Sequence, residues 1–165
     1  MLKNKKITTL EGITIIKKIF NEIKHIKYES KEFIRNSKEI INSGKGDCHE
    51  QALVIYDKCI NENLNAKRLF FIAYNPKNPP NSPGGETHTL CYVNLGEKIF
   101  WIENAWYEMK GIHEFNSLHE LKEEIKKSYL KFSKTVKLFP NLYFKQVTNK
   151  KTNISLKEYV ELIMR

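Results

Sequence analysis

Hydrophobic residues near the start of the chain recur at the spacing of an amphipathic helix. Thr8 and Glu11 form a capping-box pattern, which marks the beginning of a helix. The apolar positions that follow share one helical face: they are Ile15, Ile16, Ile19, Phe20, Ile23 and Ile26. We therefore predict a helix over residues 8–28.

Two further helices are predicted before residue 65. The first begins near Ser30 and ends at the Ser43-Gly44 turn, and its predicted inward positions are Phe33, Ile34, Ile40 and Ile41. The second begins at Asp47 or Cys48. Its residues Cys48, Ala52, Ile55 and Cys59 are four, three and four positions apart, which places them on one inward stripe. Cys59 is thus expected to be a small core residue.

The middle of the chain has the pattern of β-strands. Residues 66–74 are apolar and aromatic, as in a buried strand. Residues 87–95 and 98–104 are strand-like segments joined by a glycine-containing turn, which predicts an antiparallel hairpin. Between these regions, the proline- and glycine-rich residues 75–86 are expected to form a loop that could act as a flap.

The last third of the chain predicts a helix, a strand and a terminal helix. The helices cover residues 117–132 and 155–164, and the strand covers residues 142–147. No internal repeat interrupts this order, and 165 residues suffice for one core. We expect a single α+β domain over residues 1–165, in which N-terminal helices and the Cys48 helix accompany an antiparallel sheet of about four strands.

Charge and cysteine content narrow the classes of function. The net charge is +9, but the lysines are scattered along the chain instead of forming one block. Basic residues do alternate with aromatic ones in residues 129–132 and 142–145, as a single-strand nucleic-acid surface would require. Solvated lysines on amphipathic elements explain this pattern better, so we do not expect nucleic acid as a partner.

The location expected from the sequence is the cytoplasm. The three cysteines, Cys48, Cys59 and Cys91, have no paired spacing, which argues against a disulfide framework and favours a reducing compartment. The basic N-terminus precedes no unbroken apolar segment, so a signal peptide and a membrane span are not expected. The sequence leaves the oligomeric state open.

Candidate chemistry centres on Cys48, which follows the glycine-rich turn of residues 44–47 and begins a helix. Free backbone N–H groups and the positive end of the helix dipole favour a thiolate at such a position. A thiolate nucleophile needs a base, and the base needs an orienting partner. Counting outward from the hairpin turn at Gly96 brings His88 and Glu103 together on adjacent strands, so these two residues fill those roles.

Several other residues are candidates for supporting roles. Asn104 is the rival orienter, but strand alternation places it on the opposite face from Glu103. An oxyanion would be held by the backbone N–H of Cys48 and one further donor, for which Asn42, His49 and Gln51 are the candidates. Trp106 is expected to form one wall of the cleft as well as to pack.

A metal site is the second chemical possibility. Cys48-His49 and His88-x-x-Cys91 contain the ligand types that zinc prefers. Strand residues three apart face opposite sides, however, and the chain has no Cys-x-x-Cys pair. We therefore predict neither a metal nor a cofactor.

These features resemble the core of the transglutaminase-like superfamily of papain-fold cysteine enzymes. The similar features are Gly46-x-Cys48 at a helix start, His88 at the start of a strand after a Pro/Gly loop, and an acid at the end of the next strand. The resemblance covers about residues 40–107, and Glu103 stands where aspartate is usual. Cys48-x-Glu50 is also similar to arylamine N-acetyltransferases, whose Arg-Gly-Gly approach to the cysteine is missing here.

The resemblance implies attack on an amide or thioester carbonyl and an acyl-enzyme intermediate. The activity we expect is hydrolysis of a peptide or isopeptide bond in a peptide or protein substrate. Transglutamination or deamidation of glutamine is the first alternative. The second is an inactive binding module of the same fold that contacts its partner through a basic surface.

Overall fold

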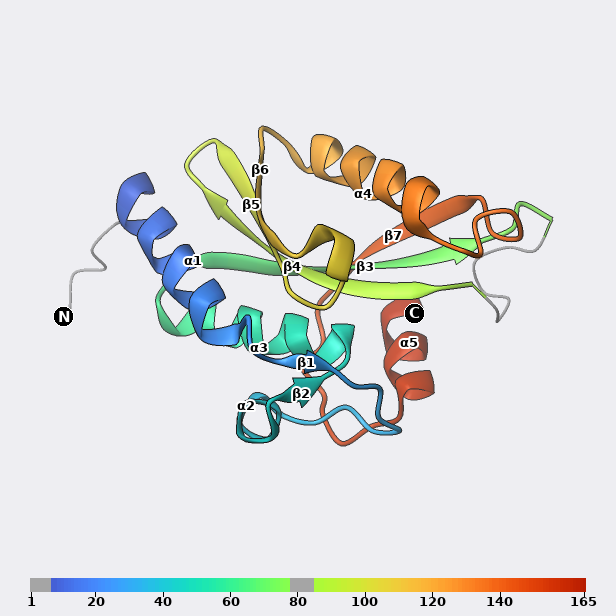
Figure 1. The fold of residues 1–165 in the computed structure, drawn as a ribbon, viewed down its shortest axis with the longest axis horizontal. Coiled ribbons are helices and arrows are strands. Elements are labelled where there is room, and N and C mark those ends of the chain that lie inside the picture. The colour runs from blue at the N-terminus through green and yellow to red at the C-terminus, as the bar shows by residue number, and fades with distance from the viewer. Residues whose placement is uncertain (1–6, 78–84) are drawn as a thin grey trace.

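The computed structural model describes residues 7–77 and 85–165 and has an α+β fold (Figure 1). Its main sheet is antiparallel and has five strands in the order β6-β5-β4-β3-β7. In chain order the strands are β3 (Asn65–Tyr74), β4 (Thr87–Leu95), β5 (Lys98–Glu103), β6 (Gly111–Phe115) and β7 (Asn141–Val147). The sequence predicted four of these five strands, all except β6.

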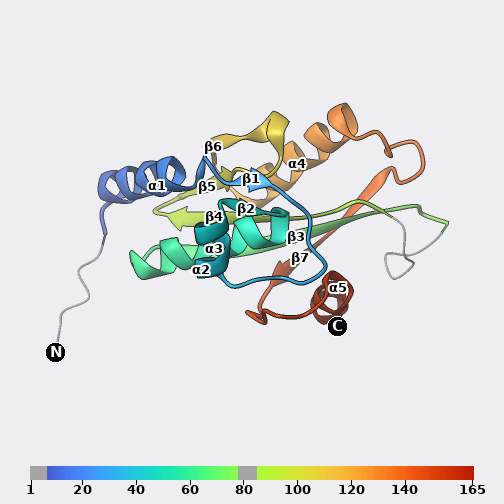
Figure 2. The ribbon, with the colours of Figure 1, turned by 60° about the horizontal axis from the view of Figure 1, so that its bottom comes forward.

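Helices cover both faces of this sheet, as Figures 1 and 2 show. One face carries α1 (Thr9–Ile23), α3 (Cys48–Asn61) and α5 (Leu156–Met164), and the other carries α4 (Leu118–Phe132). Successive residues of each strand face opposite sides of the sheet, so each central strand contributes side chains to the cores on both faces. Phe70 packs with the α5 residues, whereas Phe71 packs with the α4 residues.

The unpredicted strand β6 lies at the edge of the sheet beside β5. Its five residues, Gly111–Phe115, alternate too weakly for the pattern to reveal a strand. Pairing with β5 and the contact of the His113 ring with the Trp101 ring, 5.0 Å between centroids, place it there. Tertiary contacts therefore override the weak local preference.

The first helix is shorter than predicted, since α1 ends at Ile23 and not near Tyr28. Beyond it, β1 (Lys27–Tyr28) pairs in parallel with β2 (Lys45–Gly46) to make a small second sheet. The side chain of Asn104 donates to the carbonyl oxygens of Ile23 and Ile26, at 3.1 Å each. Asn104, which is distant in sequence, thus satisfies carbonyl oxygens at the end of α1 and just beyond it, to which a further helical turn would have donated.

The second predicted helix is also wrong in its first half, because α2 spans only Ser37–Ser43. Residues 30–36 are not helical. There the backbone of Ile34 exchanges hydrogen bonds with the segment before α5, donating to Ile154 O at 2.9 Å and accepting from Asn153 N at 2.7 Å. Phe33 and Ile41 are exposed instead of inward, while Ile34 and Ile40 are buried as predicted.

The remaining helices begin where their caps predict. Ser117 caps α4, and Ser155 with Glu158 forms the capping box of α5. Cys59 is fully buried in the core formed with α1 and the sheet. Of the loop predicted as a flap, residues 78–84 lie outside the described part of the chain.

Candidate active site

Cys48 is the first residue of α3, and only 6% of the residue is exposed. The N-cap Asp47 and Glu50 form a capping box, which fixes the start of the helix at Cys48. Gly44 ends α2 in the left-handed conformation, with φ 64°. A Cβ at Gly46 would lie 3.0 Å from Ile40 Cγ2 and 3.3 Å from Glu50 Cβ, so this tight turn has little space for a larger residue.

Arg35 holds this turn in place through a buried carboxylate. Its Nε and Nη2 donate to Glu50 Oε1 and Oε2 at 2.9 and 2.7 Å, and its backbone N–H also donates to Oε1. Nη2 of Arg35 further donates to Lys45 O at 3.0 Å. Arg35 therefore links residues 44–47 to the first turn of the Cys48 helix. The role of Arg35 was not predicted, because Glu50 lies off the stripe predicted to be inward and only the structure shows that it is buried.

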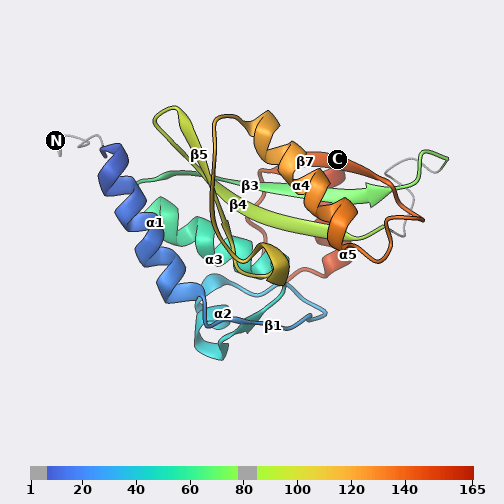
Figure 3. The same ribbon diagram turned by 45° about the horizontal axis from the view of Figure 1, so that its top comes forward.

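The predicted contact between His88 and Glu103 is present. Nε2 of His88 lies 2.8 Å from Oε2 of Glu103, and both side chains are buried. The β5 strand ends at Glu103, and its last pair with β4 is Ile102 with Cys91. His88 therefore lies on the part of β4 that continues past the end of β5. Figure 3 shows the N-terminal end of α3 near the segment that follows β5. The contact with Glu103 uses Nε2 of His88, so Nδ1 is the ring nitrogen not engaged by this carboxylate.

Glu103 is held by four hydrogen bonds. Its Oε1 accepts from the backbone N–H groups of Ala105 and Trp106 at 2.8 and 2.9 Å. Its Oε2 accepts from Trp101 Nε1 at 3.1 Å, in addition to the contact with His88. Burial raises the pKa of this carboxyl, but His88 and these donors outweigh burial and lower it overall. Glu103 is thus a fixed negative charge beside the imidazole.

Cys48 and His88 have the electrostatics of a thiolate–imidazolium pair. Burial favours the neutral thiol, yet the imidazoles of His49 and His88 lower the pKa of Cys48 well below its usual range. Burial likewise opposes the charged form of His88, and Glu103 together with Cys48 raises the pKa of His88 to about 10. The negative thiolate and the positive ring therefore stabilise each other.

His49 is a second histidine next to the thiol. Its Nδ1 lies 2.6 Å from Thr89 Oγ1, and its ring packs 4.7 Å from the ring of Tyr159. Burial lowers the pKa of His49, but the charges of Cys48 and Asp47 raise it overall. His49 was predicted only as an oxyanion donor, and its electrostatic interaction with the thiolate was missed.

The other predicted donors have different roles. Asn42 is exposed on α2, which does not fit an amide folded over a buried sulfur. Nε2 of Gln51 donates to Gly46 O at 2.7 Å, and its Oε1 accepts from Asn104 Nδ2 at 2.5 Å. Asn104 faces α1 and α3, as alternation predicts, and does not orient His88. Gln51 and Asn104 therefore tie α3 to α1 and β5.

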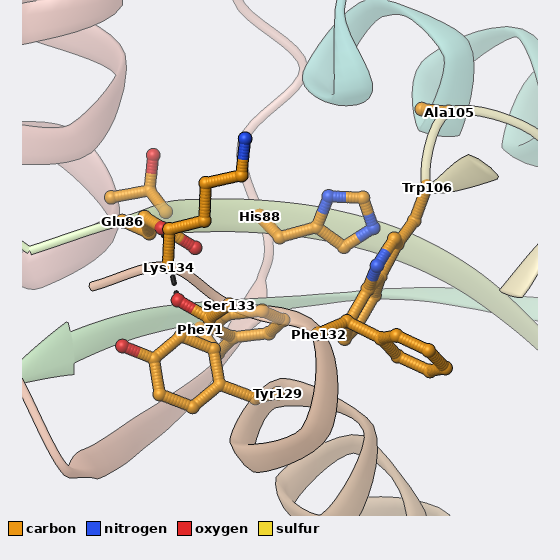
Figure 4. Close-up of a pocket in the computed structure, with 10 residues that line it drawn as sticks. Phe71, Glu86, His88, Ala105, Trp106, Tyr129, Phe132, Ser133 and Lys134 are labelled. Atoms are coloured by element: carbon orange, nitrogen blue, oxygen red, sulfur yellow. Dashed lines mark hydrogen bonds between the residues drawn. The ribbon is translucent and has the colours of Figure 1, made fainter. Parts of the chain in front are cut away.

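Trp106 forms one wall of a cavity of about 330 Å³ next to His88 (Figure 4). Its ring meets the His88 ring edge-on, with 5.6 Å between centroids. The cavity lies on the α4 side of the sheet. Its lining residues are Phe71, Glu86, Thr87, His88, Ala105, Trp106, Tyr129, Phe132, Ser133 and Lys134.

Within residues 7–77 and 85–165, no three His, Cys, Asp or Glu side chains come together as metal ligands would. The helices of the same part of the chain are too short or too polar to cross a bilayer.

Comparison with known proteins gives a likeness of fold. No protein-family model matches the chain, and no curated protein matches it in sequence. Among solved structures, Legionella pneumophila LapG is similar, with a TM-score of 0.50 at 12% sequence identity, over 93% of this chain and 77% of LapG. The chain thus has the α+β fold of a papain- or transglutaminase-like core.

Proposed function

We propose that this protein is a thiol-dependent acyl-transfer enzyme that hydrolyses a peptide or isopeptide bond in a peptide or protein substrate. One observation carries the proposal: the buried imidazole of His88 contacts the Glu103 carboxylate through Nε2, and the same imidazole helps to lower the pKa of the Cys48 thiol. The fold neighbour LapG is a transglutaminase-like cysteine protease, which supports an enzyme of this kind.

In the proposed reaction Cys48 is the nucleophile. Its thiolate attacks the carbonyl carbon, and the backbone N–H of Cys48 at the start of α3 is directed toward the developing oxyanion. As the C–N bond breaks, the His88 imidazolium gives its proton to the departing amine, which leaves an acyl-thioester and a neutral imidazole.

Water completes the cycle. Neutral His88 takes a proton from the water that attacks the acyl-thioester, and the C–S bond breaks. This step restores the thiolate and the imidazolium. Throughout, Glu103 orients the ring and stabilises its positive form. If an amine replaced water, the same steps would give the transglutaminase-type alternative.

Location and organisation are part of the same proposal. A nucleophilic thiol must stay reduced, and Cys48, Cys59 and Cys91 are all free and buried. We therefore place the enzyme in the cytoplasm, where it acts as a single domain.

Alkylation of Cys48 by iodoacetamide across pH tests the proposal. We expect Cys48 to react at pH values where an ordinary thiol, with a pKa of about 8.5, is protonated. The His88→Ala variant should lose this advantage, because the cation that stabilises the thiolate is gone. A Cys48 that reacts like a free thiol, with no effect of His88→Ala, would support the inactive binding module instead.

A further inference from the structure

The cavity beside His88 has an aromatic wall and a polar rim. The Phe71 ring lies 6.3 Å, between centroids, from the Trp106 ring and equally far from the Tyr129 ring, and Phe132 of α4 adds a fourth ring to the lining (Figure 4). The Tyr129 hydroxyl donates to Phe139 O at 2.8 Å, so its hydrogen bond is made outside the cavity lining. Tyr129 therefore presents its ring carbons to a ligand, as Phe71, Trp106 and Phe132 do.

Two polar residues of the rim, Glu86 and Ser133, are hydrogen-bonded to each other. Oε1 of Glu86 accepts hydrogen bonds from the hydroxyls of Ser133 and Thr135 at 3.0 and 2.8 Å. Thr87, His88 and Lys134 are the other polar residues of the lining, and they lie beside the aromatic rings. The volume of about 330 Å³ lies at the small end of ligand pockets and suits one large side chain.

The position of the cavity relative to the reacting groups determines which side of the substrate it contacts. His88 lines the cavity, whereas Cys48 is not among the described lining residues. In acyl transfer the carbonyl carbon bonds to the sulfur, while the amine nitrogen receives its proton from the imidazole. The half of the substrate that carries the amine must therefore lie over His88.

We propose that this cavity binds a large apolar or aromatic side chain of the leaving amine, on the residue just after the scissile bond. The inference rests on the proposed function. The departing amine takes the proton of His88 and leaves the acyl group on Cys48. By the reverse path, an incoming amine binds in the same cavity, gives its proton to His88, attacks the thioester carbon and displaces the Cys48 thiolate.

A competition between acceptor amines tests this assignment. A methyl thioester of N-acetylglycine would acylate Cys48 without using the cavity. Phenylalaninamide and glycinamide then compete with water for the acyl-enzyme, and the amide and acid products are quantified by mass spectrometry. Burial of an aromatic side chain predicts a preference of about 10-fold to 100-fold for phenylalaninamide.

Substitutions in the cavity lining test whether the preference for phenylalaninamide arises from this cavity. Phe132→Ala should reduce the preference for phenylalaninamide several-fold, and Phe132→Leu should restore most of it. Leu130→Ala is the matched control, since Leu130 is on the same helix, is 56% exposed and does not line the cavity. All variants are compared at equal concentrations of alkylatable thiol, so a folding defect does not imitate lost selectivity.

Three outcomes would overturn the assignment. If the acyl-enzyme forms but both amines partition equally, the cavity does not bind the leaving side, although the proposed function stands. If the preference follows the side chain of a phenylalanine thioester donor instead, the cavity binds the acyl side. If no acyl-enzyme forms at all, the proposed function fails and the inference fails with it.

Discussion

Trp101 donates its indole N–H to Oε2 of Glu103 at 3.1 Å, and the same carboxylate oxygen contacts His88 Nε2 at 2.8 Å. Two residues apart on β5, Trp101 and Glu103 lie on one face of the strand. The indole is fully buried, so it shields the contact between His88 and Glu103 from water. The long side chain of Glu103 is thereby fixed through both of its carboxylate oxygens.

Replacing Glu103 with glutamine should weaken the thiolate–imidazolium pair of Cys48 and His88 while a side chain of the same volume stays in place. The amide keeps the volume but lacks the charge that raises the pKa of His88, so the pKa of His88 falls and that of Cys48 rises. We expect the turnover of an amide substrate to drop about 10²-fold or more. Glu120→Gln on the exposed start of α4 is the control, and equal turnover of both variants would contradict the role of Glu103.

The pH profiles of amide cleavage and of Cys48 alkylation should differ at alkaline pH. Amide cleavage needs the imidazolium, so it should decline as pH rises through the His88 pKa of about 10. Alkylation needs only the thiolate, so it should not decline there. On the acid side both should persist below the usual thiol range and fall together, because the lowered pKa of Cys48 governs both. A common alkaline decline with retained circular dichroism would contradict His88 as the acid.

The parts of the site that the sequence predicted depend on local geometry. The start of α3 follows from the capping residues Asp47 and Glu50, and the meeting of His88 with Glu103 follows from counting along one hairpin. Neither inference needs knowledge of distant contacts. This explains why the Cys48 position and the adjacent-strand pair could be predicted together.

The parts that were missed depend on contacts between segments far apart in the chain. Arg35 lies in a region predicted as helix, and only the folded chain brings it to Glu50. His49 meets Thr89 across a sequence separation of 40 residues. The cavity likewise combines Phe71 from β3 with Phe132 from α4. Periodicity gives the face of an element, not its partner on another element.

Removing Arg35 should destabilise the protein strongly. Arg35→Met would leave the fully buried carboxylate of Glu50 without its cation. We expect a loss of about 3–5 kcal/mol in the free energy of unfolding, measured with urea. Lys18→Met is the control, because its exposed ion pair with Glu62 should contribute about 1 kcal/mol or less. Similar losses in the two variants would show that Arg35 does not hold the turn before Cys48.

At Asp47 the charge near Cys48, the proposed nucleophile, can be changed without removing the helix cap. Burial first, and then the charge of Cys48, raises the pKa of Asp47 to about 6, so near neutral pH its carboxylate opposes the thiolate. Asn caps a helix about as well as Asp, so Asp47→Asn should alter the free energy of unfolding by about 1 kcal/mol or less. Because the opposing charge is lost, the pKa of Cys48 should fall, and the acid limb of iodoacetamide alkylation should move to lower pH. Asp57→Asn, later on α3, is the control for a general charge effect. A shift to higher pH would mean that Asp47 stabilises the thiolate through the turn instead of repelling it.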